Sequence, residues 1–478
     1  MGVKPLYYSI ANDNVIFSSE IKSILMSRNK NEISNRSVAC YLKYGYIPAP
    51  ETMWRGVRKL EMGHVIEIDI SNKEFNKSSY WDCEAEFDER DELSLDKLDE
   101  LINQSISLRC DADVEVGCFL SGGYDTSLTA AVMQRQSKNP IKTFNVGFDD
   151  ADFDESVYAR KVAEYIGSEH YHVTCTPDFV KQTIKELPKI CDDPVADASI
   201  FPTILVSRLA RKYVKVALSS DGGDELFAGY DVYSKSIEHY NLIKLVPLPL
   251  RKKISLLMRN ATSKDKNFYS KYSRRIRRLS RLIESENSLE VKNSYQAIFD
   301  EEEINKILTS PSRIKKRKSP SKGKLNDLLI DDLKHSHSDQ LLSKVDRASM
   351  HSSIEAREPF LDIKLIKYAS KISEHQKLKG RNSKMPLKTL AHKYIPKELL
   401  DRPKQGFSIP IKSWLEKEIS YLIDEVFSSD GMKHNIFNQA SIEKILKMYH
   451  KRDGVNFRQL WTLMSFQIWC EHWKEYQK

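Results

Sequence analysis

The stretch that decides the fold is SGGYDTS, residues 121–127. It follows an apolar, strand-like segment, residues 114–120, and precedes a helical pattern at residues 128–136. Glycines let the backbone approach a polyphosphate closely, while hydroxyls and the amides at a helix start donate to its oxygens. The positive end of the helix dipole also favours an anion. The stretch therefore predicts a phosphate-binding loop between a strand and a helix.

Asp125 lies inside this loop, where its carboxylate would repel a phosphate. The repulsion is removed if a hard cation such as Mg²⁺ lies between the two groups, so Asp125 predicts a nucleotide bound together with a metal. The alternative is an ordinary strand-turn-helix connection, because Ser, Gly and Asp are common in such turns. Two further segments favour the functional interpretation.

The first of these segments is SSDGGDELFAGY, residues 219–230, which follows a second apolar run at residues 214–218. It is a glycine-containing turn with three acids. Ligands of open parallel sheets bind in crevices beyond the carboxyl ends of the strands. Two such loops on neighbouring strands would therefore face one nucleotide from two sides. The second segment is DRPKQGFS, residues 401–408, in which Lys404 is flanked by Pro and Gly. Taken alone, a lysine in such a loop is most often a solvated surface charge.

Together these residues resemble the synthetase domain of the glutamine-dependent asparagine synthetases, which are members of the N-type ATP pyrophosphatase family. SGGYDTS is similar to the family's SGGxDSS pyrophosphate loop, with Thr126 keeping the hydroxyl of the usual Ser. SSDGGDELFAGY resembles the second nucleotide loop, and RPKQGFSIP the stretch that carries the catalytic lysine. Supporting segments in the same order are TFNVGF at 143–148, DES at 154–156, EHYH at 169–172, DRASM at 346–350 and EAREPFLD at 355–362, which resembles EVRVPFLD. The resemblance covers nearly the whole chain.

The resemblance implies an asparagine synthase that amidates aspartate at the expense of ATP. In such a reaction the carboxylate attacks the α-phosphorus to give β-aspartyl-AMP and pyrophosphate, and ammonia then displaces AMP. By resemblance, Lys404 and Asp221 are catalytic, Asp125 and Asp224 are the metal ligands for Mg²⁺, and Arg357 is a structural or substrate-orienting residue. The implied ATP-binding residues are Ser121, Gly122, Gly123, Asp125, Thr126, Ser127, Val146, Ser219 and Ser220.

The N-terminal part, residues 1–83, reads as short strands and turns and resembles the later half of the family's glutaminase domain. The family's glutaminase uses a cysteine directly after the initiator methionine, whereas position 2 here is Gly2. Glycine supplies no thiol nucleophile, and Cys40 and Cys83 sit in no resembling context. We therefore expect the enzyme to use ammonia, or glutamine through a separate glutaminase. A fragment, a split gene and a natural ammonia-using enzyme all stay open.

Residues 84–94 are acidic and polar and are interpreted as a linker. Residues 95–478 are interpreted as the synthetase domain, in which apolar runs at 114–120, 142–147, 171–174 and 214–218 alternate with helical patterns. This alternation predicts an α/β fold with a doubly wound parallel sheet. From residue 233 the pattern is mostly helical, and Trp461, Phe466, Trp469 and Trp473 at helical spacing indicate core.

The composition agrees with a globular enzyme of 478 residues, with 40% hydrophobic and 30% charged residues. Since no apolar run approaches the length of a membrane span and no signal-peptide core is present, we expect a cytoplasmic protein that does not bind membranes. The seven cysteines include no C-x-x-C pair, which favours buried thiols over disulfides or zinc. Basic runs at 251–281 and 313–324 lack interleaved aromatics, so a solvated surface is favoured over a nucleic-acid interface.

Three alternatives stay open at this point. The ligase domain would also suit another acid, such as a sugar uronate or a precursor of a secondary metabolite. RNA-modifying ATP pyrophosphatases form a second class, although their thiolating members need cysteine pairs that this chain lacks. The chain would otherwise be an inactive binding module, against which the intact loops and Lys404 argue. Whether the protein forms a homodimer is also open.

Overall fold

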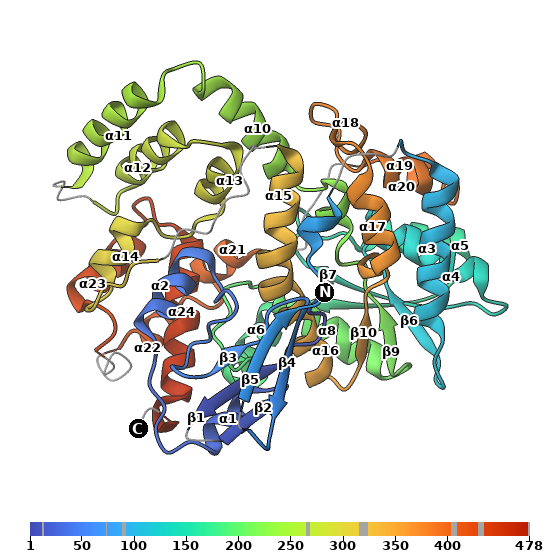
Figure 1. The fold of residues 1–478 in the computed structure, drawn as a ribbon, viewed down its shortest axis with the longest axis horizontal. Coiled ribbons are helices and arrows are strands. Elements are labelled where there is room, and N and C mark those ends of the chain that lie inside the picture. Colours follow the sequence, from blue (N-terminus) through green and yellow to red (C-terminus); the bar gives the residue numbers. More distant parts are fainter. Residues whose placement is uncertain are drawn as a thin grey trace.

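A parallel sheet with the strand order β10-β9-β6-β7-β8 forms the centre of the protein (Figure 1). Its strands are β6 (Val116–Phe119), β7 (Lys142–Phe148), β8 (Glu169–Cys175), β9 (Val216–Leu218) and β10 (Glu355–Arg357). The computed structural model describes residues 1–11, 14–72, 74–87, 92–263, 268–314, 324–402, 409–428 and 435–476. The parallel pairing confirms the α/β prediction.

The order of the strands creates a switch point beside β6. The chain runs outward from β6 through α4 (Tyr124–Gln136) to β7, and through α5 (Ser156–Ile166) to β8. It then returns through α8 (Ile200–Arg211) to β9, on the other side of β6. Crevices for ligands open at such points, beyond the carboxyl ends of the strands. The two loops predicted to bind nucleotide leave β6 and β9 at this edge.

Strand β10 is absent from the sequence prediction. It has only three residues, and two of them, Glu355 and Arg357, are charged. It pairs with β9 in parallel register, Ala356 opposite Ala217. Ala356 is buried, whereas the charged neighbours are partly exposed. So short a strand carries no hydrophobic pattern that distinguishes it from a loop.

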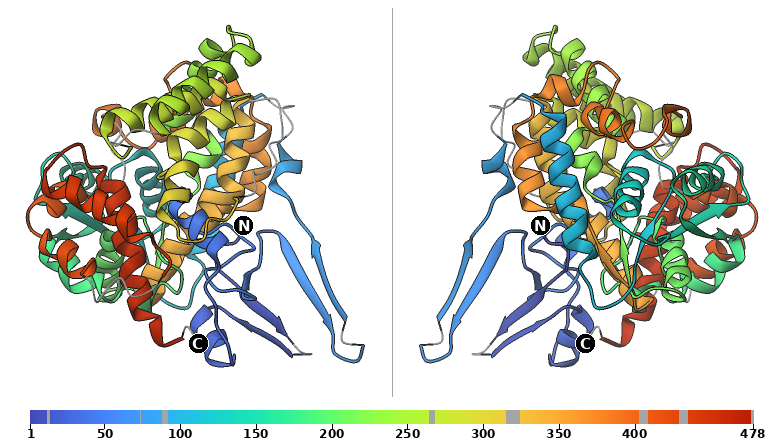
Figure 2. Two further views of the ribbon diagram at one scale, coloured as in Figure 1. Left: turned by 90° about the vertical axis from the view of Figure 1, so that its left-hand side faces the viewer. Right: turned by 90° about the vertical axis from the view of Figure 1, so that its right-hand side faces the viewer.

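The N-terminal part forms two antiparallel ribbons, as the short-strand pattern predicts. One contains β1 (Tyr7–Ala11), β2 (Asn14–Ser18) and β3 (Arg58–Lys59) in the order β2-β1-β3. The other is the hairpin of β4 (His64–Asp69) and β5 (Glu74–Ser79). Figure 2 shows both ribbons projecting from the body of the molecule. The helices of this part are α1 (Ile21–Met26) and α2 (Asn35–Tyr44).

The far end of the chain completes the core around the N-terminal part. Helix α24 (Phe457–His472) is largely buried, and its Trp469 packs on Trp54 with ring centroids 5.4 Å apart. Trp473 meets the same ring at 6.0 Å, and the Tyr41 hydroxyl donates to the Thr462 carbonyl at 3.0 Å. The aromatic residues of this segment are therefore core, as predicted.

Most of the other elements are helices. Those before β10 are α3 (Leu95–Cys110), α6 (Pro177–Ile184), α7 (Leu187–Ile190), α9 (Gly223–Phe227), α10 (Asp231–Ile243), α11 (Leu248–Ser263), α12 (Lys271–Glu284), α13 (Ser288–Gln296), α14 (Glu301–Ile307), α15 (Leu325–Asp331), a π-helical segment (Asp332–Leu342) and α16 (Ser343–His351). Those after it are α17 (Ile363–Lys371), α18 (Glu374–Lys377), α19 (Met385–Ala391), α20 (Lys397–Leu400), α21 (Ile411–Glu416), α22 (Tyr421–Val426) and α23 (Gln439–His450). Short 3-10 turns lie at Cys83–Glu86, Pro359–Leu361 and Lys474–Tyr476.

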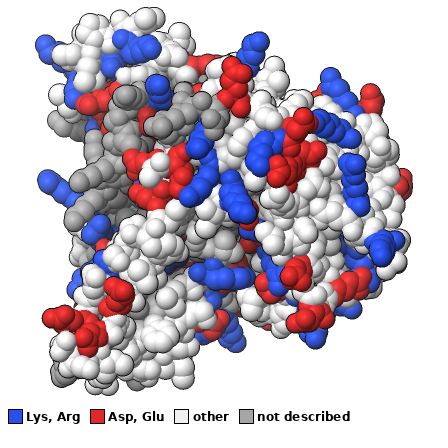
Figure 3. Space-filling view, turned by 45° about the vertical axis from the view of Figure 1, so that its right-hand side comes forward, with Lys and Arg blue, Asp and Glu red and all other residues white. Residues whose placement is uncertain are grey.

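The charged side chains only partly match the sequence interpretation. On the face in Figure 3 basic and acidic groups are interspersed. The basic run at 251–281, interpreted as a solvated face, buries Arg251 and Arg277. Arg277 is neutralised by ion pairs with Asp300 at 2.8 Å and Glu303 at 2.7 Å. The run at 313–324 lies mostly outside the described residues. None of the described helices has the length and apolar character that a membrane crossing requires.

All seven cysteines are free thiols. Six of them are buried, and Cys110 is intermediate in exposure, in agreement with the prediction. Burial raises the pKa of Cys83 to about 12, so this thiol is not an activated nucleophile at neutral pH.

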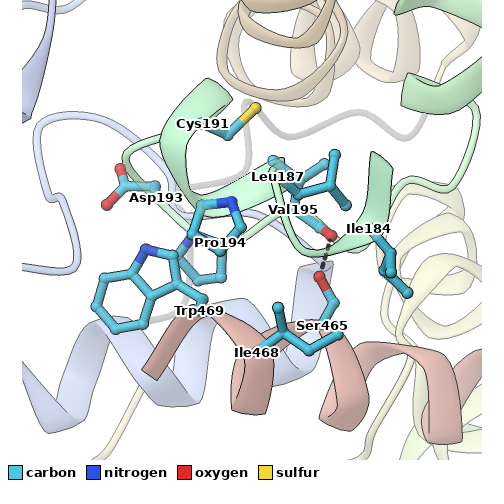
Figure 4. Close-up of a pocket in the computed structure, with 10 residues that line it drawn as sticks. Ile184, Leu187, Cys191, Asp193, Pro194, Val195, Ser465, Ile468 and Trp469 are labelled. Carbon is cyan, nitrogen blue, oxygen red and sulfur yellow. Dashed lines mark hydrogen bonds between the residues drawn. The ribbon is translucent and has the colours of Figure 1, made fainter. Parts of the chain in front are cut away.

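Asp193 joins the N-terminal part to the sheet domain and makes stability depend on pH. It follows α7, beside an apolar cavity against α24 (Figure 4), and accepts a hydrogen bond from the Met53 amide at 2.9 Å. Burial, with a smaller contribution from Asp192, raises the pKa of Asp193 to about 7. The folded state thus binds more protons than the unfolded state between about pH 4 and 7. The free energy of unfolding should therefore fall as pH rises through this window.

The Asn side chain of Asp193→Asn keeps the shape but cannot ionise. The free energy of unfolding of this variant should therefore not fall as pH rises. We expect the variant to be more stable than the parent at pH 8 by about 1–3 kcal/mol and to lose the advantage near pH 4. Urea unfolding across this range measures the effect. Asp113→Asn, at an exposed position, is the control and should leave the pH profile unchanged. An Asp193→Asn profile parallel to that of the parent would contradict the assignment.

Candidate active site

The SGGYDTS stretch forms the turn from β6 into α4. The Ser121 hydroxyl lies 3.0 Å from that of Thr126 and accepts from the Gly123 amide at 3.3 Å. Gly122 has a φ of +78°, and a Cβ there would stand 2.7 Å from the backbone nitrogen of Ala159. The turn therefore needs glycine for both its conformation and its packing. Its hydroxyls are held together at the start of the helix.

The second loop leaves β9 and lies against the first. The Ser219 hydroxyl donates to Asp221 at 2.5 Å, and the Ser220 hydroxyl donates to Thr129 of α4 at 3.0 Å. A Cβ at Gly223 would stand 2.8 Å from a carboxylate oxygen of Asp125, so glycine permits this close approach. The residues predicted to bind nucleotide from two strands therefore meet at one edge of the sheet.

A lysine that the sequence analysis missed joins the two loops. The Lys384 ammonium is buried and ion-pairs with Asp125 and with Asp224, the latter at 2.7 Å. Burial disfavours its charge, but the two carboxylates outweigh this and raise the pKa of Lys384. A Cβ at Gly229 would clash with both Asp224 and Lys384, so this glycine makes room for the pair. The site thus holds two carboxylates and one fixed ammonium.

No local pattern points to Lys384. It lies in the stretch NSKMP and immediately precedes α19, with Pro386 in the first turn of that helix. Its φ of 55° is a left-handed conformation that few non-glycine residues adopt, which indicates a position fixed by its surroundings. Such strain is often found at functional sites. In the sequence the residue reads as one more surface lysine.

Lys404 lies outside the described residues, but the chain that leads to it is anchored at the site. Arg402 is largely buried, ion-pairs with Glu155 at 2.8 Å and donates to the Ser121 carbonyl at 3.3 Å. Its guanidinium also lies over the Tyr158 ring, 4.5 Å from the centroid. Arg402 thus lies beside the phosphate loop, two positions before Lys404 in the sequence.

Asp221, which is partly exposed, lies near a buried acid, Glu358, which directly follows β10. Burial, and to a smaller extent the charge of Asp221, raises the pKa of Glu358 to about 8. Glu358 stands where the EVRVPFLD pattern has valine. The local resemblance therefore gave no reason to expect an acid here, and the position is absent from the predicted site.

Three further residues from the sequence prediction, Val146, Ser127 and Arg357, lie in surroundings that differ from one another. Val146 lies in β7 and is buried in the main hydrophobic cluster. The Ser127 side chain is also buried, in the first turn of α4. Arg357 donates to the carbonyls of Arg109 and Asp111, at 2.9 and 3.0 Å, which indicates a structural role.

The carboxylates fit a magnesium ion that is shared with a nucleotide. Among the described residues there is no group of three or more His, Cys, Asp or Glu side chains able to enclose a metal alone. Mg²⁺ is commonly held by one or two carboxylates together with substrate phosphates and water. Asp125 and Asp224 already share one cation, the Lys384 ammonium. Two carboxylates and one ammonium leave a net negative charge, which favours a further cation between the two loops.

Comparisons with known proteins show the family to which the chain belongs. A family model described as asparagine synthase matches residues 97–471. The chain belongs to the asparagine synthase family. A second model, described as a glutamine amidotransferase domain, matches residues 1–81.

Relatives align over most of the chain. The glutamine-hydrolysing asparagine synthetase 1 of Bacillus subtilis is 29% identical, over 98% of this chain and 73% of its own length. A putative glutamine-hydrolysing asparagine synthetase 2 of Methanocaldococcus jannaschii is 37% identical over 48% of this chain and 45% of its own. The amidase chyE of Penicillium rubens is 23% identical over 98% and 75%. The family thus includes proteins named for more than one activity.

Proposed function

We propose that this protein is an asparagine synthase that amidates aspartate through β-aspartyl-AMP, with release of pyrophosphate and AMP. The observation that carries the proposal is the meeting of Asp125, Asp224 and Lys384 between two glycine-containing loops at the switch point of the sheet. We further propose residues 1–83 as a glutaminase-like domain, 84–94 as the linker and 95–478 as the synthetase domain. The family matches at 1–81 and 97–471 support this division.

In the proposed first step, an oxygen of the aspartate side-chain carboxylate attacks the α-phosphorus of ATP, and the bond to pyrophosphate breaks. Ser121, Gly122, Gly123, Thr126 and Ser127 would hold the departing pyrophosphate through backbone amides and hydroxyls at the start of α4. Val146, Ser219 and Ser220 would line the nucleotide. Mg²⁺ held by Asp125 and Asp224 would neutralise phosphate charge. Lys384 and Lys404 would place fixed positive charge beside the phosphate oxygens, on which negative charge builds up in the transition state.

In the second step, ammonia attacks the acyl carbon and the bond to AMP breaks, which leaves asparagine once the nitrogen has lost a proton. Asp221, whose carboxylate lies near Glu358, is the proposed catalytic residue of the second loop. Glu358 has a pKa of about 8, so it would exchange a proton near neutral pH.

The nitrogen source can be tested directly. Cys40 and Cys83 are the cysteines of the glutaminase-like part, and both are buried. Because both thiols are buried and burial raises the pKa of Cys83, we predict amide formation with ammonium and negligible release of glutamate from glutamine by this polypeptide alone. Product analysis with aspartate, ATP, Mg²⁺ and either nitrogen source measures both rates. Glutamate release at a rate comparable to synthesis would contradict the prediction.

A second candidate function is the amidation of a different carboxylic acid. It is favoured by relatives named amidase that align over 98% of this chain. A panel of acids in the same assay separates the candidates, because AMP forms only with an acid that the enzyme activates. AMP formation with a sugar uronate but not with aspartate would replace the first proposal. A lack of AMP formation with every carboxylic acid tested would contradict both candidate functions.

A further inference from the structure

Helix α11 (Leu248–Ser263) buries several polar side chains and exposes several apolar ones. The face toward the protein carries Arg251, Ser255 and Thr262, which are 5%, 1% and 2% exposed. The solvent-exposed side carries Leu250, Ile254 and Leu257, which are 50%, 38% and 69% exposed. A surface helix normally presents its apolar face to the core and its polar face to water. The outer face of α11 is therefore suited to an apolar environment.

The buried polar side chains of this helix are held by hydrogen bonds. The Arg251 guanidinium donates to the carbonyls of Val246 at 2.9 Å, Ile283 at 3.1 Å and Ser285 at 2.6 Å. The Ser255 hydroxyl donates to Glu284 at 2.9 Å. A rotation of the helix that buried its leucines would break the hydrogen bonds of Arg251 and Ser255, which is costly. The orientation of α11 is thus fixed.

The apolar surface extends along the chain before α11. Leu242 and Leu245 are 64% and 77% exposed, and with Leu250, Ile254 and Leu257 they form what we call the α11 ridge. Figure 1 places α11 on the outer rim of the molecule, with α12 packed along its inner side. The residues of the ridge are therefore accessible to solvent.

The ridge lies in a strongly basic region. Residues 248–263 and 268–284 contain ten Lys and Arg residues and one acid, Glu284. Lys244 and Lys253 are exposed and directly precede Leu245 and Ile254 of the ridge in the sequence. Lys252 is exposed as well and pairs with Glu286 at 2.7 Å. An apolar stripe with lysines along it matches helices that lie in the interface of an anionic membrane.

We propose that the α11 ridge docks this protein on an anionic lipid surface. The leucines would enter the boundary between headgroups and acyl chains, and the lysines would contact lipid phosphates. A nucleic acid would satisfy the lysines but offers no apolar phase to five exposed aliphatic side chains. The lack of an apolar run long enough to span a bilayer predicted no membrane association, but a helix that lies on the surface needs no such run.

The test is sedimentation of the full chain with vesicles of phosphatidylcholine, with and without phosphatidylglycerol. We expect binding only to the anionic vesicles, and weaker binding at high salt. Replacing Leu250, Ile254 and Leu257 together by Ser should lower the affinity about a hundredfold or more, because three apolar side chains lose their lipid contact. Lys244→Glu with Lys253→Glu should also abolish binding. The absence of wild-type binding to anionic vesicles would overturn the proposal.

A matched control tests whether the ridge, rather than any exposed apolar residue, is responsible. Phe17→Ser with Ile70→Ser changes exposed apolar residues of the N-terminal ribbons and should leave binding intact. Equal loss of binding in this control and in the ridge variant would overturn the proposal. So would a ridge that mediates self-association or binds RNA in place of vesicles.

A second measurement reports the contact directly and does not rely on a loss of binding. A polarity-sensitive dye on Leu257→Cys, in a Cys110→Ser background, should shift to the blue with anionic vesicles and stay unchanged with neutral ones. The same dye on Phe17→Cys should not respond to either. A silent dye at residue 257 while the protein binds vesicles would show that another surface makes the contact, which would contradict the proposal.

Discussion

Replacing Asp125 by Asn should lower the rate of AMP formation by about two to three orders of magnitude, the scale of losing one preorganised electrostatic contact in a transition state. Asn keeps the shape of the side chain but removes the charge that would balance the pyrophosphate through Mg²⁺. Asp224→Asn should have a similar effect. Both variants should need more Mg²⁺ for half-maximal activity, because each proposed ligand set has lost one anionic oxygen.

The fold should survive either substitution. Lys384 pairs with both carboxylates, so it keeps one charged partner in each variant. Single-turnover formation of AMP, measured across a range of Mg²⁺ concentrations, is the readout. Asp231→Asn is the control, because Asp231 is exposed, pairs with Lys235 at 3.4 Å and lies seven residues after Asp224. Near-normal AMP formation by Asp125→Asn would rule out the metal role.

Lys404→Ala should slow formation of the acyl adenylate by roughly a hundredfold or more if the ammonium stabilises the phosphate charge. The affinity for ATP should fall far less, since the contact strengthens only as charge develops. Lys404→Arg should also be poor, because a planar fork does not replace a compact ammonium. A lysine that is only a solvated charge would instead change stability by no more than about 0.5 kcal/mol and leave the rate alone.

Single-turnover release of pyrophosphate separates these outcomes. Lys397→Ala is a matched control in the same part of the chain, because Lys397 is exposed and pairs only weakly, at 3.6 Å, with Asp401. It should release pyrophosphate at the parental rate. A parental rate in Lys404→Ala as well would return this residue to the surface and weaken the synthetase proposal as a whole.

The parts of the site that the sequence could predict are those encoded locally. Gly122 and Gly223 permit close approaches of the backbone, and Asp125 lies within a hydroxyl-rich turn, so the type and order of the residues carry the signal. Buried strands of the parallel sheet, such as β7, can be recognised from their own residues in the same way. Their position beside one another follows from the general topology of doubly wound sheets.

The parts that could not be predicted depend on distant partners. Lys384 becomes a site residue only through Asp125, 259 positions away. Arg277 is buried only because Asp300 and Glu303 are folded against it, and an isolated basic helix gives no sign of this. Strand β10 is defined by its register with β9, not by its own three residues. In each case the physical cause is tertiary and overrides the local propensity.

The packing of Trp54 against Trp469 and Trp473 also bears on how the polypeptide reaches its native state. The early helices and ribbons cannot acquire their final neighbours until the last helix has been synthesised. At about 5–20 residues per second this is a delay of roughly 20–80 seconds on the ribosome. During that time exposed strand edges are open to wrong pairing. Production of the protein should accordingly depend on chaperones and on the speed of translation more than its native stability alone suggests.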